Sequence, residues 1–299
     1  MTFCHTLKST AIGAILAGIA CGPALAGTVT LENTFALANQ LADPRSNFNP
    51  QGLGYDTATN ELLYMQQSSR TIFRSDLSGN ITGSLGITLN HTTSVAGDGA
   101  NYYVSDYTSN TSGPDLFRVD KTTGVPTNMS TDVAGYGGYP IDVRDGNLYR
   151  TNVSTTYGWA NLNQIRISAV ATPDAGVQTV TLATGAGIGD IAVDSTRNNV
   201  WVLDYSAGAA LRRFDLATGA ELDSFSLGLD GLTGGLTYAN DKLYYYDWVS
   251  GSGSTLSLKI IQIRPPEGMP PALTPPPAGG TVSLAPGATL TGTVTGQHT

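Results

Sequence analysis

The chain has 299 residues, of which 13% are charged, with 15 basic against 23 acidic side chains and a net charge of −8 at pH 7. This acidic balance argues against nucleic acid or an anionic membrane as the partner, because both attract basic surfaces. The two cysteines are Cys4 and Cys21, so the sequence after residue 21 has no thiol nucleophile, thiolate metal ligand or disulfide.

The first 26 residues have the features of a secretory signal peptide. Lys8 supplies a positive start, residues 11–20 are apolar, and Ala24-Leu25-Ala26 forms a cleavage site. The apolar stretch is shorter than the roughly 20 residues of a membrane-spanning helix. We therefore expect a secreted chain, periplasmic or extracellular, with the low charge common among secreted bacterial β-proteins. Lipidation at Cys21 is the alternative, but the leucine usual three residues before such a cysteine is missing.

One five-residue phrase recurs five times in the chain. Each copy is apolar, β-branched or aromatic and ends on Asp, Asn or Gln, and the copies start 40, 46, 52 and 43 residues apart. The copies are Leu62–Gln66, Tyr102–Asp106, Leu148–Asn152, Val200–Asp204 and Leu243–Asp247. Strand repeats at this spacing are typical of β-propeller blades.

Each phrase is flanked by sequences that fit the other strands of a four-stranded antiparallel blade. A short apolar strand and a polar turn come before it, and two further strands follow. The predicted innermost strands are 52–56, 94–98, 141–145, 190–194 and 235–239. The predicted third strands are 72–76, 116–120, 165–167, 211–215 and 258–261. The predicted fourth strands are 81–87, 125–133, 177–182 and 221–227.

The fifth unit lacks a fourth strand of its own, because its third strand runs into Arg264-Pro265-Pro266. Residues 31–37, near the start of the chain, resemble the fourth strand at 222–227. We therefore predict an all-β, five-bladed β-propeller over residues 27–263, in which the N-terminal strand closes the last blade and removes an exposed edge. Six blades would need a repeat that the sequence does not contain.

Residues 264–299 differ in composition from the rest. They contain eight prolines and read as a polyproline-like linker followed by a Thr/Gly-rich tail. Two stretches of the tail, 281–284 and 288–294, alternate like strands. One interpretation is a disordered tail, since the segment cannot build a core alone. The other is self-association, in which residues 281–295 pair with the open edge of a neighbouring subunit.

Propeller ligands usually bind where the loops before the first strand and after the second strand gather around the axis. Aromatic side chains there suit sugars or other flat, hydroxylated ligands. Tyr157 and Trp159 interrupt the repeat, and four polar residues stand at the entry to innermost strands. The ligand-binding candidates are Gln51, His91, Thr93, Tyr139, Tyr157, Trp159, Asp190 and Thr233.

Signals for catalysis and metal binding are weak. His91 with an Asp and Ser94 would permit hydrolase chemistry, but a single histidine on a turn is more often a surface residue, and we assign no catalytic residue. The sequence has no H-x-x-x-H, EF-hand or phosphate-loop pattern. We predict no metal ligand and no cofactor, with Ca²⁺ bound in the channel through Asp190 as an open alternative. The recurrence of Asp at the end of the phrase favours a structural role for these residues.

The repeat resembles the NHL, YVTN and SMP-30/gluconolactonase group of β-propellers over residues 29–263. The segments that carry this resemblance best are Gly189–Asp194, Val200–Asp204 and Arg213–Gly219. The resemblance implies the propeller fold. For lactonases of the group it also implies a divalent metal held by a Glu, two Asn and an Asp in the channel. Of these, only Asp190 has a matching position here, while Glu32 falls on the expected closing strand.

Three functions are compatible with the sequence. The leading hypothesis is a secreted propeller that binds a small, carbohydrate-like ligand or another protein, or acts as a scaffold. The alternatives are a metal-assisted hydrolase or lactonase of the SMP-30 type and a self-assembling extracellular surface or fibre subunit. The enzyme question stays open, and the balance favours a non-enzymatic role because titratable residues are not concentrated in one place.

Overall fold

The computed structural model describes residues 30–36, 50–66, 70–89, 92–106, 116–130, 140–151, 163–183, 188–204, 210–226, 235–249 and 257–264. All regular secondary structure within these ranges is β-strand, as predicted. The described ranges include no helix with the length and apolar character that a membrane crossing requires. The expected signal peptide and, apart from Arg264, the Pro-rich tail lie outside these residues.

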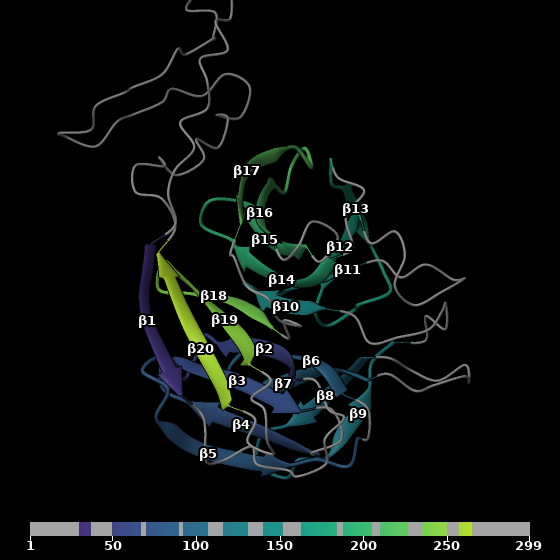
Figure 1. Cartoon of the computed structure of the whole chain (residues 1–299). Helices are drawn as coiled ribbons and strands as arrows, with labels where there is room; N and C mark the ends of the chain where they lie inside the picture. The colour runs from purple at the N-terminus through teal and green to yellow at the C-terminus, as the bar shows by residue number, and fades with distance from the viewer. Residues whose placement is uncertain are drawn as a thin grey trace, which may run out of the picture.

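The described strands form five four-stranded antiparallel units (Figure 1). From the innermost strand outward, unit 1 contains β2 (Pro50–Asp56), β3 (Glu61–Gln66), β4 (Thr71–Ser75) and β5 (Ile81–Gly86). Unit 2 contains β6 (Thr92–Gly97), β7 (Asn101–Asp106), β8 (Leu116–Asp120) and β9 (Pro126–Asn128). Unit 3 contains β10 (Ile141–Arg144), β11 (Asn147–Thr151), β12 (Gln164–Ala169) and β13 (Gln178–Thr181). Unit 4 contains β14 (Ile188–Asp194), β15 (Asn199–Asp204), β16 (Ala210–Asp215) and β17 (Glu221–Ser226). Unit 5 contains β18 (Leu236–Ala239), β19 (Lys242–Val249), β20 (Ser257–Arg264) and β1 (Thr30–Ala36).

The strand β1 is the outermost strand of unit 5, although it comes first in the chain. It pairs antiparallel with β20, from Thr30 opposite Arg264 to Ala36 opposite Lys259. Figure 1 shows the purple β1 beside the yellow-green β20. The predicted closure of the last unit by the N-terminal strand is therefore confirmed.

The innermost strands form a closed ring. The strand β2 contacts β6, β6 contacts β10, β10 contacts β14, β14 contacts β18, and β18 contacts β2. Antiparallel four-stranded sheets repeated around one axis define a β-propeller. The predicted fold class is thus confirmed, and the described strands contribute five units to the ring.

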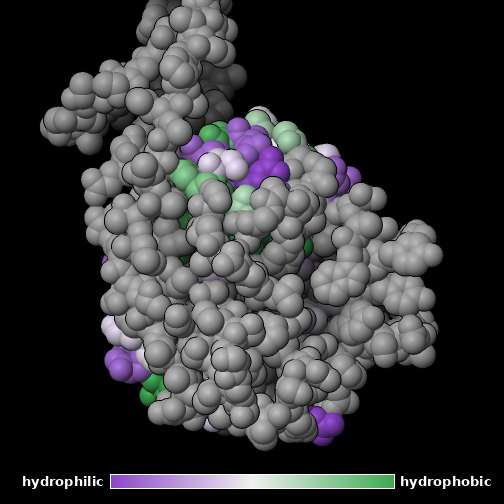
Figure 2. Space-filling model, viewed as in Figure 1, coloured by the Kyte–Doolittle hydropathy of each residue, from purple (hydrophilic) through white to green (hydrophobic). Residues whose placement is uncertain are grey.

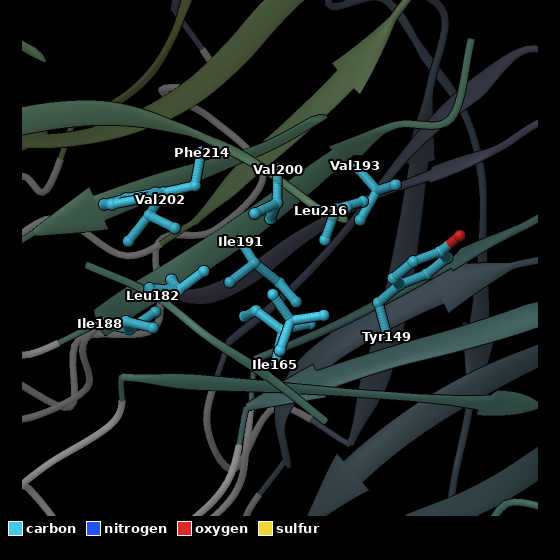
Figure 3. Close-up of a cluster of buried hydrophobic side chains, with 11 residues drawn as sticks. Tyr149, Ile165, Leu182, Ile188, Ile191, Val193, Val200, Val202, Phe214 and Leu216 are labelled. Atoms are coloured by element: carbon cyan, nitrogen blue, oxygen red, sulfur yellow. The ribbon is translucent and has the colours of Figure 1, made fainter. Parts of the chain in front are cut away.

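The hydrophobic core lies between neighbouring units, because both faces of the second strand are buried. In β15, Val200 and Val202 belong to the cluster between units 3 and 4, whereas Trp201 and Leu203 belong to the cluster between units 4 and 5. Figure 3 shows the first of these clusters, in which Tyr149 and side chains such as Ile191 come together from the two units. Side chains on a strand alternate between its faces, so a strand buried on both sides reads as the continuous apolar phrase of the repeat.

Units 1 and 2 share a single eight-stranded sheet, since β2 and β6 meet through their backbones. A Cβ on Gly54 would lie 1.9 Å from the carbonyl oxygen of Val95, and a Cβ on Gly52 would lie 2.5 Å from the Cα of Ser94. Only glycine permits so close an approach of two backbones. The neighbouring innermost strands at the other junctions are not hydrogen-bonded to each other as one sheet.

The Asp-x-x-Thr-Gly turn of the repeat also joins neighbouring units. In unit 4, Asp215 Oδ1 accepts hydrogen bonds from the backbone amide and the hydroxyl of Thr218. Gly219 follows with a φ of 73°, and its carbonyl accepts a hydrogen bond of 2.8 Å from the amide of Ala183, just after β13 of unit 3. A Cβ on Gly219 would lie 1.9 Å from the carbonyl oxygen of Thr181, so this glycine serves both the turn and the contact between units.

The predicted strands agree with the described ones to within three residues at each end, with one exception. The outermost strand of unit 2 was expected over 125–133, but β9 spans only Pro126–Asn128. Asn128 Oδ1 accepts a hydrogen bond from the amide of Ser130, a local bond that favours a turn over a continued strand. That expected strand was therefore too long.

Candidate functional site

Three charged side chains are buried where the innermost strands meet. Asp142 and Arg144 lie on β10 and Asp190 lies on β14, and each is no more than 5% exposed. A buried charge is costly unless it is paired and hydrogen-bonded. The hydrogen-bond and ion-pair partners of these side chains therefore indicate their role at the centre of the ring.

Asp142 and Arg144 connect unit 3 to three other units. Asp142 Oδ2 accepts a hydrogen bond of 2.8 Å from the amide of Val193 in unit 4 and lies 3.2 Å from Arg144 Nη2. Arg144 donates to the carbonyl oxygens of Val193 and of Tyr238 in unit 5, at 3.2 and 2.8 Å. Its guanidinium lies over the ring of Tyr55 in unit 1, 5.4 Å from the ring centre. One arginine thus links units 1, 3, 4 and 5.

The pKa of the Asp142 carboxyl is raised by burial, and the Arg144 guanidinium opposes that shift. The amides of Val193 and Val143 also oppose it by donating hydrogen bonds to the carboxylate. These donors favour the charged form, and they come from the strands that the carboxylate joins.

Asp190, a predicted ligand-binding candidate, joins unit 4 to unit 5. Its Oδ1 accepts a hydrogen bond of 2.9 Å from the amide of Ile191, and its Oδ2 accepts one of 2.6 Å from the amide of Leu236. Burial raises the pKa of this carboxyl well above its usual range, and the backbone donors, including the amide of Leu53 in unit 1, oppose the shift. Both carboxylate oxygens are therefore occupied by bonds within the ring.

Ser94 makes the corresponding connection between units 2 and 3. Its hydroxyl oxygen accepts a hydrogen bond of 3.1 Å from the amide of Ile141 and lies 3.4 Å from that residue's carbonyl oxygen. Glycines join units 1 and 2, and polar side chains join the units that follow. The buried charges at the axis thus supply hydrogen bonds that the edges of the innermost strands would otherwise lack.

A second polar cluster lies at one end of units 2 and 3, where β6 and β10 begin and β7 and β11 end. We call it the unit 2–3 loop end and define it by Thr92, Thr93, Ser94, Ser105 and Thr151. Thr93 Oγ1 lies 2.8 Å from Ser105 Oγ. Ser94 reaches β10 through Ile141, and the amide of Thr151 donates to the carbonyl of Pro140 just before β10.

Two hydroxyls of the unit 2–3 loop end are unsatisfied. Thr92 and Thr151 are each 1% exposed, and within the described structure neither hydroxyl has a hydrogen-bond partner. A buried hydroxyl without a partner costs about 1–3 kcal/mol, so each such group in a native fold requires an explanation. A bound molecule with hydroxyl groups is one way to satisfy them.

The unit 2–3 loop end departs from the repeat in a way visible in the sequence. The fourth position of the repeated phrase is Met65 in unit 1 and Leu203 in unit 4, but Ser105 in unit 2 and Thr151 in unit 3. Sequence reasoning did not single out Thr92, Ser105 or Thr151, and this change from apolar to hydroxyl side chains was the available signal. It also missed Asp142 and Arg144, two charges within an otherwise apolar innermost strand.

The structure places three of the eight predicted candidates. Thr93 lies at the unit 2–3 loop end and Asp190 on β14, so these two lie on different innermost strands. The backbone of Gln51 lies on β2, opposite Met65. The other candidates lie outside the described residues, and they are His91, Tyr139, Tyr157, Trp159 and Thr233.

Four of those five candidates are close in the chain to the unit 2–3 loop end. His91 immediately precedes β6, and Tyr139 precedes Pro140, the residue just before β10. Tyr157 and Trp159 follow β11 by six and eight residues. The sequence therefore attaches most of its aromatic and polar candidates to one end of two adjacent units.

One of the recurrent Asp residues makes an ion pair at the end of its strand. Asp204 at the end of β15 pairs with Arg212 of the neighbouring strand β16, at 2.9 Å. Within the described ranges, His, Cys, Asp and Glu side chains nowhere form a group of three suited to a metal ion. Ca²⁺ binding through Asp190 stays an open alternative to the prediction of no metal ligand.

The closed ring of four-stranded units makes this chain a β-propeller. A scan of protein-family models and a search of curated proteins found no match.

Solved structures provide the comparisons. A glutaminyl cyclase from Myxococcus xanthus has a TM-score of 0.53 at 13% identity, with 79% of this chain and 96% of that chain covered. A gluconolactonase from Xanthomonas campestris has a TM-score of 0.48 at 13% identity, with 81% and 98% covered. A chain of a nidogen/laminin complex has a TM-score of 0.47 at 15% identity, with 67% and 72% covered. At these identities the likeness concerns the fold alone.

Proposed function

We propose that this chain is a secreted β-propeller that binds a small hydroxylated ligand of carbohydrate-like chemistry at the unit 2–3 loop end. The observation that carries the proposal is the pair of buried, unsatisfied hydroxyls of Thr92 and Thr151. The same loop end also contains the hydroxyls of Thr93 and Ser105, which lie 2.8 Å apart. Convergent polar groups of this kind orient a ligand in a binding site.

The neighbouring chain segments supply the apolar part of such a site. Tyr139, Tyr157 and Trp159 adjoin the unit 2–3 loop end in the sequence. Aromatic rings present a flat apolar face together with a polar edge or tip, a combination that suits the C–H face of a sugar ring. Hydroxyls beside the rings then bond the ligand's own hydroxyls.

The bonds of the axial carboxylates support binding rather than hydrolysis as the function. In the SMP-30-type alternative, Asp190 would hold a divalent cation, yet both of its oxygens already accept backbone hydrogen bonds. A cation there would have to displace the bonds that join units 4 and 5. We therefore assign Asp190 to the closure of the ring and propose a protein partner, rather than a reaction, as the next alternative to a small ligand.

The proposal is tested by screening the full chain against a panel of mono- and oligosaccharides, followed by calorimetry on the compounds that bind. Thr93→Val and Tyr157→Ala should each weaken binding by about tenfold, which corresponds to about 1.4 kcal/mol. Thr179→Val, on the exposed outer strand β13, serves as the control. The proposal would be refuted if all three variants bound a sugar as tightly as the wild type, or if no sugar in the panel bound.

Self-association through residues 281–295 is a second candidate function. The observation that favours it is the outer rim, where each outermost strand has a described neighbouring strand on one side only. Deletion of residues 281–295 should convert an assembled chain to the monomer in multi-angle light scattering. If the deletion leaves the molar mass of the full chain unchanged apart from the missing residues, this candidate fails.

A further inference from the structure

The five outermost strands, β1, β5, β9, β13 and β17, form an outer rim of strand edges. An exposed edge presents unpaired backbone groups to which another chain can add a strand. Proteins usually protect such edges with short strands, prolines or charged side chains. The rim strands differ in whether they carry this protection.

Four of the five rim strands are protected. The strand β9 has three residues and begins at Pro126, and β13 has four residues. In β17, Glu221 and Asp223 form ion pairs with arginines of β16, and β1 contains Glu32. Each of these strands is a poor template for an added strand.

The strand β5 is the exception. It spans six residues, Ile81–Gly86, and contains neither a charged residue nor a proline. Thr82, Ser84 and Gly86 are exposed, while the residues between them are partly buried. Figure 1 shows β5 along the outer rim with β4 on its inner side. Two charged side chains of the same unit lie near β5. Glu61 of β3 accepts a hydrogen bond of 2.5 Å from the Thr82 hydroxyl, and it pairs with Arg74 of β4 at 3.5 Å.

We propose that β5 is the docking edge for residues 288–294 of a second copy of this chain. That segment, Ala288-Thr289-Leu290-Thr291-Gly292-Thr293-Val294, alternates with the period of a strand, and its three threonines share one face. When the segment pairs with β5, its threonines lie beside Thr82 and Ser84, and Leu290 extends the partly buried row. Thr–Thr and Thr–Ser pairs directly across two strands stabilise the pairing of those strands.

The tail is long enough to reach another molecule. The 23 residues from 265 to 287 separate β20 from the docking segment and are rich in proline. In an extended polyproline conformation, at ~3.1 Å per residue, they span about 70 Å. A domain of this size is about 45 Å across. The inference rests on the self-association candidate above and is independent of the proposed ligand site.

Backbone pairing fits this surface better than contact between apolar patches. Within the described ranges, the exposed large hydrophobic residues are Val125 and Leu222, and neither is on β5. Figure 2 shows hydrophilic and hydrophobic residues interspersed over the coloured part of the surface in view. Main-chain hydrogen bonds supply the affinity in strand addition, and the alternation of side chains supplies the register.

Disulfide trapping tests the proposal directly, because the chain has no cysteine after residue 21. In a full-length background with Cys4→Ser and Cys21→Ser, Ser84→Cys and Thr291→Cys chains are mixed in equal amounts and oxidised. The matched control replaces Ser84→Cys with Ser224→Cys, an exposed serine on the protected strand β17. We expect about tenfold more heterodimer with Ser84→Cys, equivalent to about 1.4 kcal/mol of preference.

Each other outcome overturns the proposal. Equal heterodimer yields at the two serines would show that β5 has no preference for the tail. A double Ser84→Cys, Thr291→Cys chain that forms its disulfide only within one molecule would show that the tail pairs with its own edge. If the full chain assembles and Ser84→Lys leaves its molar mass unchanged, self-association stands but β5 is not the docking edge.

Discussion

Gly219 is expected to be indispensable for the contact between units 3 and 4, beyond its role in a turn. Its φ of 73° lies in the left-handed region, where an L side chain costs about 1–2 kcal/mol. Gly146, in the turn between β10 and β11, has nearly the same φ of 74°, but a Cβ there would meet nothing within 4 Å. Substitution of the two glycines by alanine therefore separates backbone strain from packing.

The packing part of the cost arises from unit 3. A Cβ on Gly219 would lie 1.9 Å from the carbonyl oxygen of Thr181 and 2.8 Å from its carbonyl carbon. Relieving this overlap costs about 1–3 kcal/mol. The shift also strains the hydrogen bond from the Ala183 amide to the Gly219 carbonyl, which is worth about 1 kcal/mol. We expect Gly219→Ala to lower the free energy of unfolding by about 3–5 kcal/mol and Gly146→Ala by about 1–2 kcal/mol.

Urea denaturation followed by tryptophan fluorescence measures both values, since the buried Trp201 lies in unit 4. Gly124→Ala, in the equivalent turn of unit 2, should behave like Gly219→Ala, because a Cβ on Gly124 would lie 2.0 Å from the carbonyl oxygen of Gly86 in unit 1. The usual scatter of surface substitutions is about 0.5 kcal/mol. If the losses of unfolding free energy for Gly219→Ala and Gly146→Ala agreed within that range, the contact between units would be refuted as the reason for glycine at position 219.

Three further predictions concern the axis and the unit 2–3 loop end. Arg144→Met should lower the free energy of unfolding by about 3–5 kcal/mol, because Asp142 then stays buried without its cation. The double variant with Asp142→Asn should recover part of that loss. If urea denaturation showed no recovery, the result would argue against the ion pair. Burial raises the pKa of Asp190, so this group stabilises the fold below pH ~4 and loses that contribution as pH rises toward the folded-state pKa. The difference in unfolding free energy between wild type and Asp190→Asn should therefore shrink from pH 4 to pH 8, and a growing difference would contradict the shift. Thr151→Val should raise the free energy of unfolding by about 1–2 kcal/mol in thermal or urea denaturation, since it removes a buried, unsatisfied hydroxyl; a destabilised variant would show that the hydroxyl is bonded.

The fold could be predicted well because every unit repeats the same physical requirement. A second strand buried on both faces must be apolar throughout, as in Val200–Asp204, and this continuous pattern identified the strands. The N-terminal strand was recognisable because unit 5 otherwise lacks an outer strand. The shared sheet of units 1 and 2 was not predictable, because Gly52 and Gly54 read equally well as turn residues and their contact with β6 joins segments about 40 residues apart.

The candidate site was harder to predict. The role of each of its residues depends on hydrogen-bond partners that are remote in the sequence. Asp190 stood out as an acidic residue at the entry to a strand, but its partners are backbone amides of other units, which no local pattern reveals. Asp142 and Arg144 were missed for the same reason, since the strands they connect are remote in sequence. The hydroxyls at Ser105 and Thr151 could have been found by comparing the copies of the phrase position by position.

The differences between the units separate architecture from function. A ring that only had to close would be more stable with an apolar side chain at Thr151, and units 1 and 4 have buried Met65 and Leu203 at the equivalent positions. The buried hydroxyls of Thr92 and Thr151 have no partner among the described residues and so cost stability, and the axis already supplies the bonds that closure requires. Local conflicts with an otherwise consistent fold are expected at functional sites. The unit 2–3 loop end is such a conflict, so a variant that gains stability there should lose affinity for the ligand.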